Sequence, residues 1–255
     1  MAATATDREL EGRVAVVTGA GRNIGRAIAL ALAKGGASVV VNARSSRAET
    51  EAVAAEIEAA GGRALAVLAD VTDEAAVARM AEAAQKRFGR VDIVVNNAAV
   101  RREADLDSIT LAQWREILAI ILDGAFIVTK AFLPQLKAGG AGAIVNIGGL
   151  TGHTGGKRRA HVITAKSGLI GLTKALAHDL AEHGVTVNCV VPGLIDTVRL
   201  AGSSVMPAHH TTTKTLVGRM GKPDDIAAAV RYLAGSGGRY VTGQTLHVNG
   251  GVYLG

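Results

Sequence analysis

The sequence predicts one α/β domain, 1–255, in which helices cover both faces of a doubly wound parallel sheet. Short β-branched runs recur at regular distances, and an alanine-rich amphipathic stretch follows each run, which is the pattern of βαβ units. The first run ends in a glycine-rich turn that opens a helix. A chain of 255 residues, 49% of them hydrophobic, can bury a sizeable core within a single domain.

Seven strands are expected, each apolar on both faces because helices cover both sides of the sheet. They are Arg13–Thr18, Ala37–Ala43, Arg63–Leu68, Val91–Val95, Gly142–Ile147, Val185–Val191 and Gln244–Val248. Helices are expected near Ile24–Lys34, Arg47–Ala60, Glu74–Phe88, Leu111–Lys137, Ala160–His183 and Pro223–Gly235. Two segments do not follow this alternation of strands and helices. Residues 1–11 predict a flexible N-terminus, and residues 197–215, with Pro207 and a His-His pair, predict a mobile substrate lid.

Composition limits the classes of partner. The net charge of +6 is compatible with a nucleic-acid partner. Acidic and basic residues alternate along most predicted helices, however, and aromatic residues are only 3%, so no nucleic-acid partner is expected. The single cysteine, Cys189, lies in an apolar run and predicts a buried thiol in a reducing compartment. The N-terminus lacks the apolar core of a signal peptide, and no stretch approaches the roughly 20 apolar residues of a membrane helix. We therefore expect a cytoplasmic protein without a membrane partner.

The glycine-rich turn reads Thr18-Gly19-Ala20-Gly21-Arg22-Asn23-Ile24-Gly25. Glycines there let the backbone turn sharply and approach a pyrophosphate, which can then accept hydrogen bonds from the N–H groups at the helix N-terminus. Taken alone, such a turn is weak evidence, and an ordinary structural turn is the alternative.

Further motifs follow in order and make the turn specific. They are Asp70-Val71 after the third strand, Asn96-Asn97-Ala98-Ala99 after the fourth, Lys166, the run Pro192 to Thr197 after the sixth, and Thr242-Gly243-Gln244 before the last. Over residues 10–252 this ordered set resembles the short-chain dehydrogenase/reductase family, with Asn23 where that family usually has a glycine. The resemblance implies a Rossmann fold, a small-molecule substrate, and a homotetramer or homodimer.

The resemblance also implies a dinucleotide site. Its residues would be Gly19, Gly21, Arg22, Asn23, Ile24, Gly25, Arg44, Asp70, Val71, Asn97, Lys166, Pro192, Gly193, Ile195 and Thr197. NAD enzymes place an acidic residue at the end of the second strand, and this chain reads Val41-Asn42-Ala43-Arg44 there. Arg22 and Arg44 could bind a 2′-phosphate, so NADP(H) is expected rather than NAD(H). The alternative is that both arginines are only solvated surface residues.

Most of the catalytic residues implied by the resemblance are missing. The family typically uses Asn, Ser, Tyr and Lys, with the Tyr four residues before the Lys so that both lie on one helix face. Lys166 is kept, but the Tyr, Ser and Asn positions hold Val162, Gly149 and Ile121. The enoyl-reductase branch places its Tyr seven residues before the Lys, where this chain has Arg159. The three tyrosines of the chain, Tyr232, Tyr240 and Tyr253, are far away in the sequence.

Neighbouring residues could replace the lost groups. His153 and His161 titrate near neutrality, so together with Lys166 they are the candidate catalytic residues; structural roles for both histidines are the alternative. A cluster of basic residues could make the pocket mouth electropositive and favour an anionic substrate, or could simply be a solvated face or a subunit contact. Its members are Arg101, Arg102, Lys157, Arg158 and Arg159. No metal site is expected, because His209 and His210 lack further ligands at a suitable spacing.

Two functions fit these residues. The first is an NADP(H)-dependent oxidoreductase with an altered proton relay, acting on a small carbonyl or alcohol, imine or activated alkene. The second is a catalytically inactive NADP(H)-binding protein that acts as a sensor or structural partner. Cofactor oxidation over a panel of such substrates discriminates between them.

Overall fold

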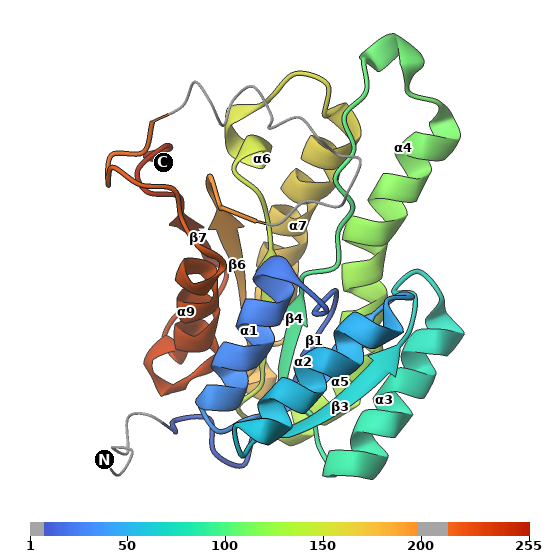
Figure 1. Cartoon of the computed structure of the whole chain (residues 1–255), viewed down its shortest axis with the longest axis vertical. Coiled ribbons are helices and arrows are strands. Elements are labelled where there is room, and N and C mark those ends of the chain that lie inside the picture. The colour runs from blue at the N-terminus through green and yellow to red at the C-terminus, as the bar shows by residue number, and fades with distance from the viewer. Residues whose placement is uncertain (1–7, 198–213) are drawn as a thin grey trace.

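The computed structural model describes residues 8–197 and 214–255 (Figure 1). Its described strands form one parallel sheet with the order β3-β2-β1-β4-β5-β6-β7, which confirms the predicted doubly wound Rossmann fold. All seven predicted strands are present, with ends within two residues of those expected. Their bounds are β1 Val14–Val17, β2 Ser38–Ala43, β3 Arg63–Leu68, β4 Ile93–Asn96, β5 Ala143–Ile147, β6 Thr186–Pro192 and β7 Thr245–Val248.

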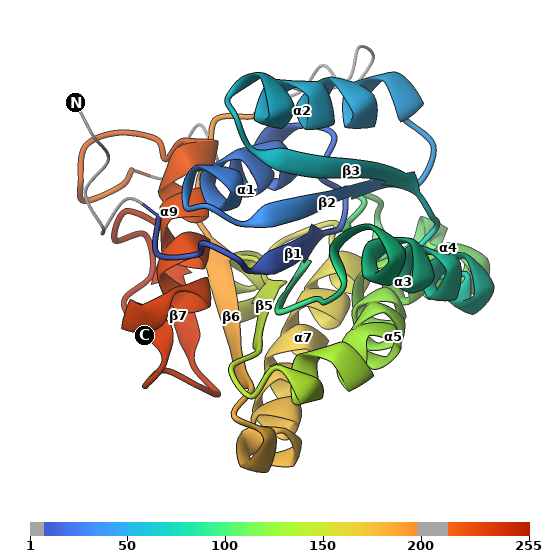
Figure 2. The same ribbon diagram turned by 90° about the horizontal axis from the view of Figure 1, so that it is seen from below.

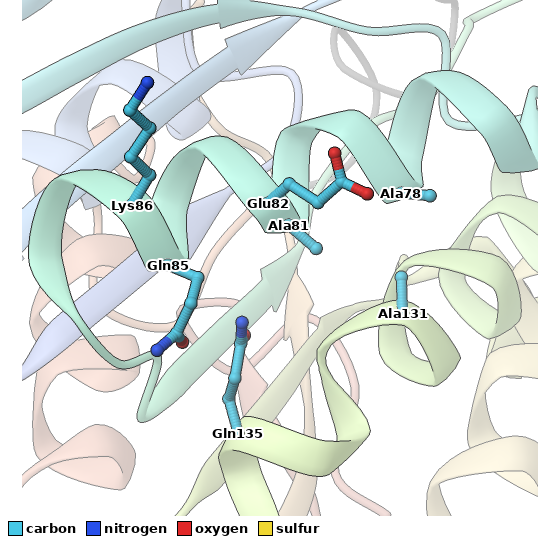
Figure 3. Close-up of a pocket in the computed structure, with 7 residues that line it drawn as sticks. All are labelled: Ala78, Ala81, Glu82, Gln85, Lys86, Ala131 and Gln135. Carbon is cyan, nitrogen blue, oxygen red and sulfur yellow. The ribbon is translucent and has the colours of Figure 1, made fainter.

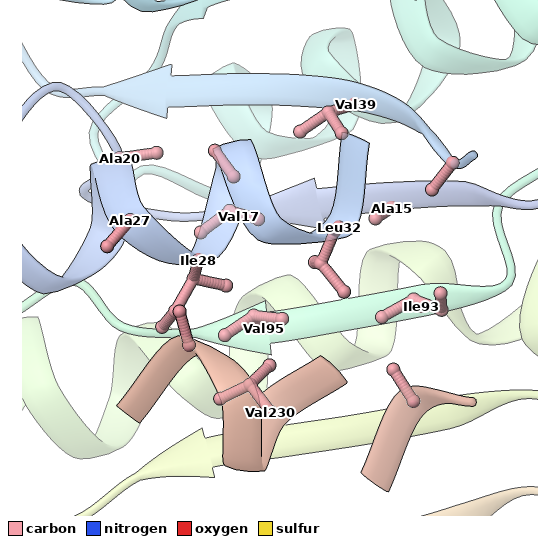
Figure 4. Close-up of a cluster of buried hydrophobic side chains, with 14 of the residues drawn as sticks. Ala15, Val17, Ala20, Ala27, Ile28, Leu32, Val39, Ile93, Val95 and Val230 are labelled. Carbon is pink, nitrogen blue, oxygen red and sulfur yellow. The ribbon is translucent and has the colours of Figure 1, made fainter. Parts of the chain in front are cut away.

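Helices cover both faces of the sheet (Figure 2). One face carries α1 (Asn23–Lys34), α2 (Arg47–Ala59) and α9 (Pro223–Ala234), and the other carries α3 (Glu74–Phe88), α5 (Gly124–Ala138) and α7 (Ala160–Asp179). Figure 4 shows the first core, where Ile28 of α1 and Val230 of α9 pack on Val17 and Val95 of the sheet. Apolar strand residues facing both ways thus hold the two helical layers.

The edge strands differ from the expectation of strands buried on both faces. β1, β4 and β5 are buried at every residue, but β3 and β7 are only partly buried, and Leu246 of β7 is 36% exposed. The reason is topological, because an edge strand has a neighbour on one side only.

The long helix predicted over Leu111–Lys137 is interrupted. It consists of α4 (Leu111–Leu118), a π-helical turn η3 (Ala119–Asp123) and α5. By length and composition the whole stretch Leu111–Ala138 could cross a membrane, contrary to the sequence-based expectation, but seven of its residues are buried in the two cores of this face. They are Ile117, Ile120, Ile121, Ala125, Val128, Phe132 and Leu136.

Shorter elements complete the described chain. The helix predicted over Ala160–His183 ends at Asp179 and is followed by the 3₁₀ turn η4 (Ala181–His183), which Gly184 closes in a left-handed conformation with φ +65°. The structure adds α6 (Thr151–Thr154), η2 (Leu106–Ser108) and η5 (Ser236–Gly238), none of which was predicted.

Two segments were expected to be flexible. In the first, residues 8–11 pack on the domain, since Leu10 is fully buried and the Glu9 carboxylate pairs with Arg231 of α9 at 2.6 Å. The prediction of flexibility is therefore wrong for these residues, and residues 1–7 lie outside the described part. Of the predicted lid, residues 198–213 lie outside it as well, including Pro207, His209 and His210.

Candidate cofactor and active site

The turn between β1 and α1 has the backbone shape of a phosphate cradle. Gly19 and Asn23 adopt left-handed conformations, with φ of +62° and +50°, which asparagine tolerates better than most residues. A Cβ atom at Gly25 would lie 2.3 Å from the Gly19 carbonyl oxygen. Arg22 is the N-cap of α1, and its side chain forms no capping hydrogen bond. The turn therefore presents the helix N-terminus to a ligand as the motif predicts.

The loop after β4 holds this turn in place. Thr18 Oγ1 accepts hydrogen bonds from the main-chain N–H groups of Asn97 and Ala98, both at 3.0 Å. The Asn97 side-chain amide donates to the carbonyl oxygens of Thr18 and Gly19, at 2.8 and 3.0 Å. The side chain of Asn97 thus positions the cradle.

The positions expected to bind the ribose phosphate and adenine lie at the ends of β2 and β3. Arg44 is exposed directly after β2, and Arg22 lies 3.8 Å from the Glu49 carboxylate, where both side chains are nearly half exposed. Asp70 accepts hydrogen bonds from the N–H and hydroxyl of Thr72, which fixes its carboxylate. Val71 is buried, and its side chain leaves no room for a Cβ at Gly124 of α5.

The remaining predicted cofactor positions lie at the end of β6 and directly after it. A Cβ at Gly193 would lie 2.5 Å from Asn249 Cα, so this bend also requires glycine. Ile195 is buried and its backbone pairs with Gly221. The predicted residues therefore gather at the carboxyl ends of the parallel strands, where ligands of such sheets bind.

Lys166 is the residue that the sequence predicts as the retained member of the catalytic set. It lies on α7, and its amine donates to the main-chain carbonyl of Ile147 at the end of β5. Burial lowers the pKa of Lys166 to about 8, helped by the charge of Arg101 and opposed by Cys189, whose own thiol pKa burial raises to about 11. Lys166 thus has a titratable proton near neutral pH.

The three positions at which the resemblance implies Ser, Tyr and Asn differ in the space and the packing around them. A Cβ at Gly149 would have only ordinary contacts, 3.7 and 3.9 Å from Lys166 side-chain atoms, so a serine would fit there. By contrast, Val162 and Ile121 pack in the same apolar cluster, together with Val100. The wall expected to carry the Tyr and Asn is therefore apolar and packed.

His161 lies in the first turn of α7 and is fully buried. Neither ring nitrogen has a hydrogen-bond partner within the described residues. Burial lowers the pKa of His161, and the charge of Arg102 adds to the effect. A weaker interaction with the Arg159 backbone, too poorly aligned to count as a hydrogen bond, opposes it, so the net shift favours the neutral imidazole at pH 7. The helix begins at Ala160 as predicted, and no shift of the helix start turns His161 toward the Tyr position.

His153 belongs to a ring cluster that the sequence did not indicate. Its ring centroid lies 4.4 Å from that of His247 on β7 and 5.4 Å from that of Tyr253. Burial lowers the pKa of both histidines. Tyr253, remote in sequence, is therefore brought to the segment that follows Gly149, an outcome of long-range packing that no local motif signals.

The stability of the fold should depend on these histidines. The pKa of His153, His161 and His247 is below the ordinary value of 6.5 in the folded state, so the unfolded chain binds protons more readily. The free energy of unfolding should then fall as the pH drops below about 6.5. Melting temperatures from pH 8 to 5 test this, and His161→Phe should show a shallower decline than the wild type. An identical decline in both would contradict a contribution from His161.

The expected electropositive mouth is largely neutralised. Arg102 pairs with Glu116 at 2.6 Å, Arg158 with Asp105 at 3.2 Å and Arg159 with Glu103 at 2.9 Å. For these three residues the ion pairs favour the alternative interpretation, a solvated face, over an electropositive mouth. Their ion pairs tie residues 102–105 to α4 and to the segment before α7, because opposite charges alternate along the two loops. Arg101 and Lys157 are both exposed.

Two surface hollows lie elsewhere. One, of about 490 Å³, lies between α3 and α5 and is lined by Glu82, Gln85 and Gln135 among others (Figure 3). The second, of about 660 Å³, lies beside η3 and includes Phe126 and Leu172. Neither includes a predicted site residue. Within residues 8–197 and 214–255 no group of three or more His, Cys, Asp or Glu side chains could hold a metal ion.

Known proteins resemble nearly the whole chain. A family model described as enoyl-(acyl carrier protein) reductase matches residues 19–253. A 3-oxoacyl-acyl-carrier-protein reductase of Staphylococcus aureus is 39% identical over 240 residues, covering 94% of this chain and 98% of that protein. An uncharacterised oxidoreductase of Methylorubrum extorquens is 40% identical over 249 residues, covering 96% and 99%.

Solved structures agree with these sequence relatives. A short-chain dehydrogenase of Burkholderia cenocepacia in complex with NADP has a TM-score of 0.88 and 35% identity, covering 96% of this chain and 99% of that one. A dehydrogenase/reductase of Sinorhizobium meliloti has a TM-score of 0.90 and 36% identity, covering 98% of both chains. The chain therefore belongs to the short-chain dehydrogenase/reductase family.

Proposed function

We propose that this protein is an NADP(H)-dependent oxidoreductase that acts on a small carbonyl or alcohol, imine or activated alkene without the usual Tyr-Ser-Asn relay. The observation that carries the proposal is that the site keeps the features that would bind the cofactor but lacks hydroxyl groups where the substrate would react. The phosphate cradle, with Gly25 and the Asn97 side chain, fits a dinucleotide, and Lys166 is retained. The positions of the usual hydroxyl groups, Gly149 and Val162, are empty of polar groups.

The arginines near β2 support NADP(H) as the cofactor, as does the NADP bound by the Burkholderia relative. Arg22 and Arg44 would hold the 2′-phosphate with charge-assisted hydrogen bonds. When bound, the nicotinamide donates or accepts a hydride. The protein then has to orient the substrate and hold or supply a proton.

Lys166 is the proposed proton carrier. An amine with a pKa of about 8 is populated in both protonation states near neutral pH, as general acid–base catalysis requires. His161 and His153 remain secondary candidates. Burial lowers the pKa of each, so both imidazoles are neutral at pH 7 and suited to accept a proton rather than to donate one. Substrates that need little protonation fit such a site best.

The second candidate function is an inactive NADP(H)-binding protein. The packing of Val162 against the cluster of Ile121 and Val100 favours it, because that wall offers no proton donor. Both functions predict cofactor binding, and only the first predicts turnover.

The test is a titration of the purified protein with NADPH and NADH, followed by NADPH oxidation over a panel of ketones, imines and activated alkenes. Tight NADPH binding with turnover of an imine or alkene supports the enzyme. Tight NADPH binding without turnover of any substrate of the panel supports the inactive binding protein. If neither cofactor binds, both candidate functions are ruled out.

The same titration tests the choice of NADP(H). Arg44→Gln should weaken NADPH binding by about 10- to 100-fold, since one charge-assisted hydrogen bond contributes about 1.5–3 kcal/mol, and should leave NADH binding unchanged. Arg47→Gln is the matched control, because Arg47 lies three residues further along, pairs with Glu51 and carries the same charge. Equal losses of NADPH affinity in both variants would mean that only the overall positive charge of this surface matters, and not a direct contact of Arg44.

The subunit state and compartment are proposed on separate grounds. Exposed apolar side chains on α5 and β7, Phe126 and Leu246, support a homotetramer or homodimer. The free, buried thiol of Cys189 supports a reducing compartment such as the cytoplasm.

A further inference from the structure

Glu49 places a carboxylate beside the glycine-rich turn. It lies in the first turn of α2, and its Oε1 atom is 3.8 Å from Nη1 of Arg22, the N-cap residue of α1. A Cβ atom at Gly21 would lie 3.3 Å from Glu49 Cβ and 3.4 Å from Glu49 Oε2, so the side chain lies against the backbone of the turn as well. A negative charge is therefore next to the turn that would bind an anionic cofactor.

The pair of Arg22 with Glu49 is looser than the ion pair that joins the same two helices one turn further along α1. There, Arg26 binds both carboxylate oxygens of Glu56, at 2.7 and 2.6 Å. The contact of Arg22 with Glu49 is longer than a hydrogen bond, and both side chains are nearly half exposed. Arg26 and Glu56 thus hold α1 to α2, whereas Arg22 can exchange its anionic partner at little cost.

The 2′-phosphate of NADP(H) is a stronger partner for Arg22 than a carboxylate is. A phosphate group carries up to about two negative charges and three acceptor oxygens, and a guanidinium can bind it with two parallel hydrogen bonds. Arg44, exposed directly after β2, supplies a second cation. Because Glu49 and the phosphate have the same sign of charge, they repel each other and compete for one guanidinium.

We infer that Glu49 is a specificity-determining residue that competes with the 2′-phosphate of NADP(H) for Arg22. In the cofactor-free protein the carboxylate pairs with the guanidinium, and the phosphate displaces it on binding. Glu49 thus lowers the affinity for NADP(H) and has little effect on NAD(H), which lacks that phosphate. This inference rests on the proposed function, since it concerns the cofactor preference of the same site.

The test measures the Kd of four ligands by calorimetry. NADPH and NADH differ by the 2′-phosphate, and so do adenosine 2′,5′-bisphosphate and adenosine 5′-monophosphate, which probe the adenosine end alone. Glu49→Gln keeps the size of the side chain and removes its charge. Glu51→Gln is the matched control, because it removes the same charge two residues further along α2, from a pair with Arg47.

Glu49→Gln should bind NADPH and the bisphosphate about 3- to 10-fold tighter than the wild-type protein does, since it removes a competing charge from a partner of a group with up to two charges. Its affinity for NADH and the monophosphate should change by less than about 2-fold, as should all affinities of Glu51→Gln. The gain should vanish in the background of Arg22→Gln, because the two residues act through one contact. Tighter binding cannot result from damage to the fold.

Other outcomes overturn the inference. They are unchanged or weaker NADPH binding in Glu49→Gln, or an equal gain in Glu51→Gln. An equal gain for NADH would show that the carboxylate repels the pyrophosphate instead, and a gain that persists with Arg22→Gln would exclude competition for that guanidinium.

The nucleotide pair separates this inference from the proposed function. If the wild-type protein binds neither NADPH nor NADH, the proposed function fails, and the comparison of the bisphosphate with the monophosphate still decides the role of Glu49. If the bisphosphate binds neither the wild-type protein nor Glu49→Gln, the inference fails too.

Discussion

The double variant Val162→Tyr with Gly149→Ser is expected to reduce simple ketones with NADPH about 10²- to 10⁴-fold faster than the wild-type protein. This is the usual contribution of a positioned general acid. The two substitutions introduce a proton donor and a hydroxyl that polarises the carbonyl at the positions where the resemblance implies them. No other variant of the chain is expected to gain as much.

The geometry admits both side chains. At Gly149 a new Cβ would have only ordinary contacts with Lys166 atoms, so the serine hydroxyl has room. Position 162 precedes Lys166 by one helical turn, which places a tyrosine on the same face of α7 as the amine, and Val162 is only partly buried. The Lys166 charge would lower the pKa of that tyrosine. Ile121 stays unrepaired, so a gain near the lower end of the range is expected.

A shape-matched control separates chemistry from packing. Val162→Phe with Gly149→Ala fills the same space without hydroxyl groups and should remain as slow as the wild-type protein. Equal gains in both double variants would mean that packing, rather than proton transfer, limits the reaction. No gain in the tyrosine variant, with NADPH binding intact, would contradict a sound hydride-transfer geometry and favour the inactive binding protein.

Local sequence patterns predicted the fold well because they carry its main constraints. The alternation of β-branched runs and alanine-rich stretches is enough to place all seven strands. The π-helical turn η3 was missed, since residues 119–123 carry no local signal that separates a π-helical turn from an α-helix; in the structure η3 packs against α7. The partial exposure of β3 and β7 follows from strand order, which no single segment encodes.

The candidate site was predictable only in part for the same reason. The positions at which the resemblance implies hydroxyl groups, 149 and 162, can be named from the sequence, because short local motifs identify them. Ion pairs such as Arg159 with Glu103 join residues 56 positions apart, and the contact of His153 with His247 joins the short helix α6 to β7. Charge counts along the chain cannot reveal which cations such contacts neutralise.

The phosphate cradle should tolerate no side chain at Gly25. A Cβ there would lie 2.3 Å from the Gly19 carbonyl oxygen, 2.6 Å from Asn97 Nδ2 and 2.9 Å from Ala20 Cα, and two of these three atoms belong to the backbone. Gly25→Ala must therefore open the turn, at a cost of about 1–3 kcal/mol for an overpacked buried site. Because each kcal/mol shifts the Tm of a domain of this size by about 2–4 °C, the melting temperature should fall by several degrees.

The same displacement should weaken NADPH binding by about 10- to 100-fold, since a lost hydrogen bond to a charged phosphate costs about 1.5–3 kcal/mol. Thermal unfolding and cofactor titration measure the two effects. Gly149→Ala is the control, because a Cβ there meets only atoms at 3.7 and 3.9 Å, and this variant should keep both the Tm and the Kd of the wild-type protein. If Gly25→Ala binds NADPH normally, the dinucleotide lies elsewhere. If it loses binding but keeps its Tm, the close approach at Gly25 serves the ligand, and the fold does not depend on it.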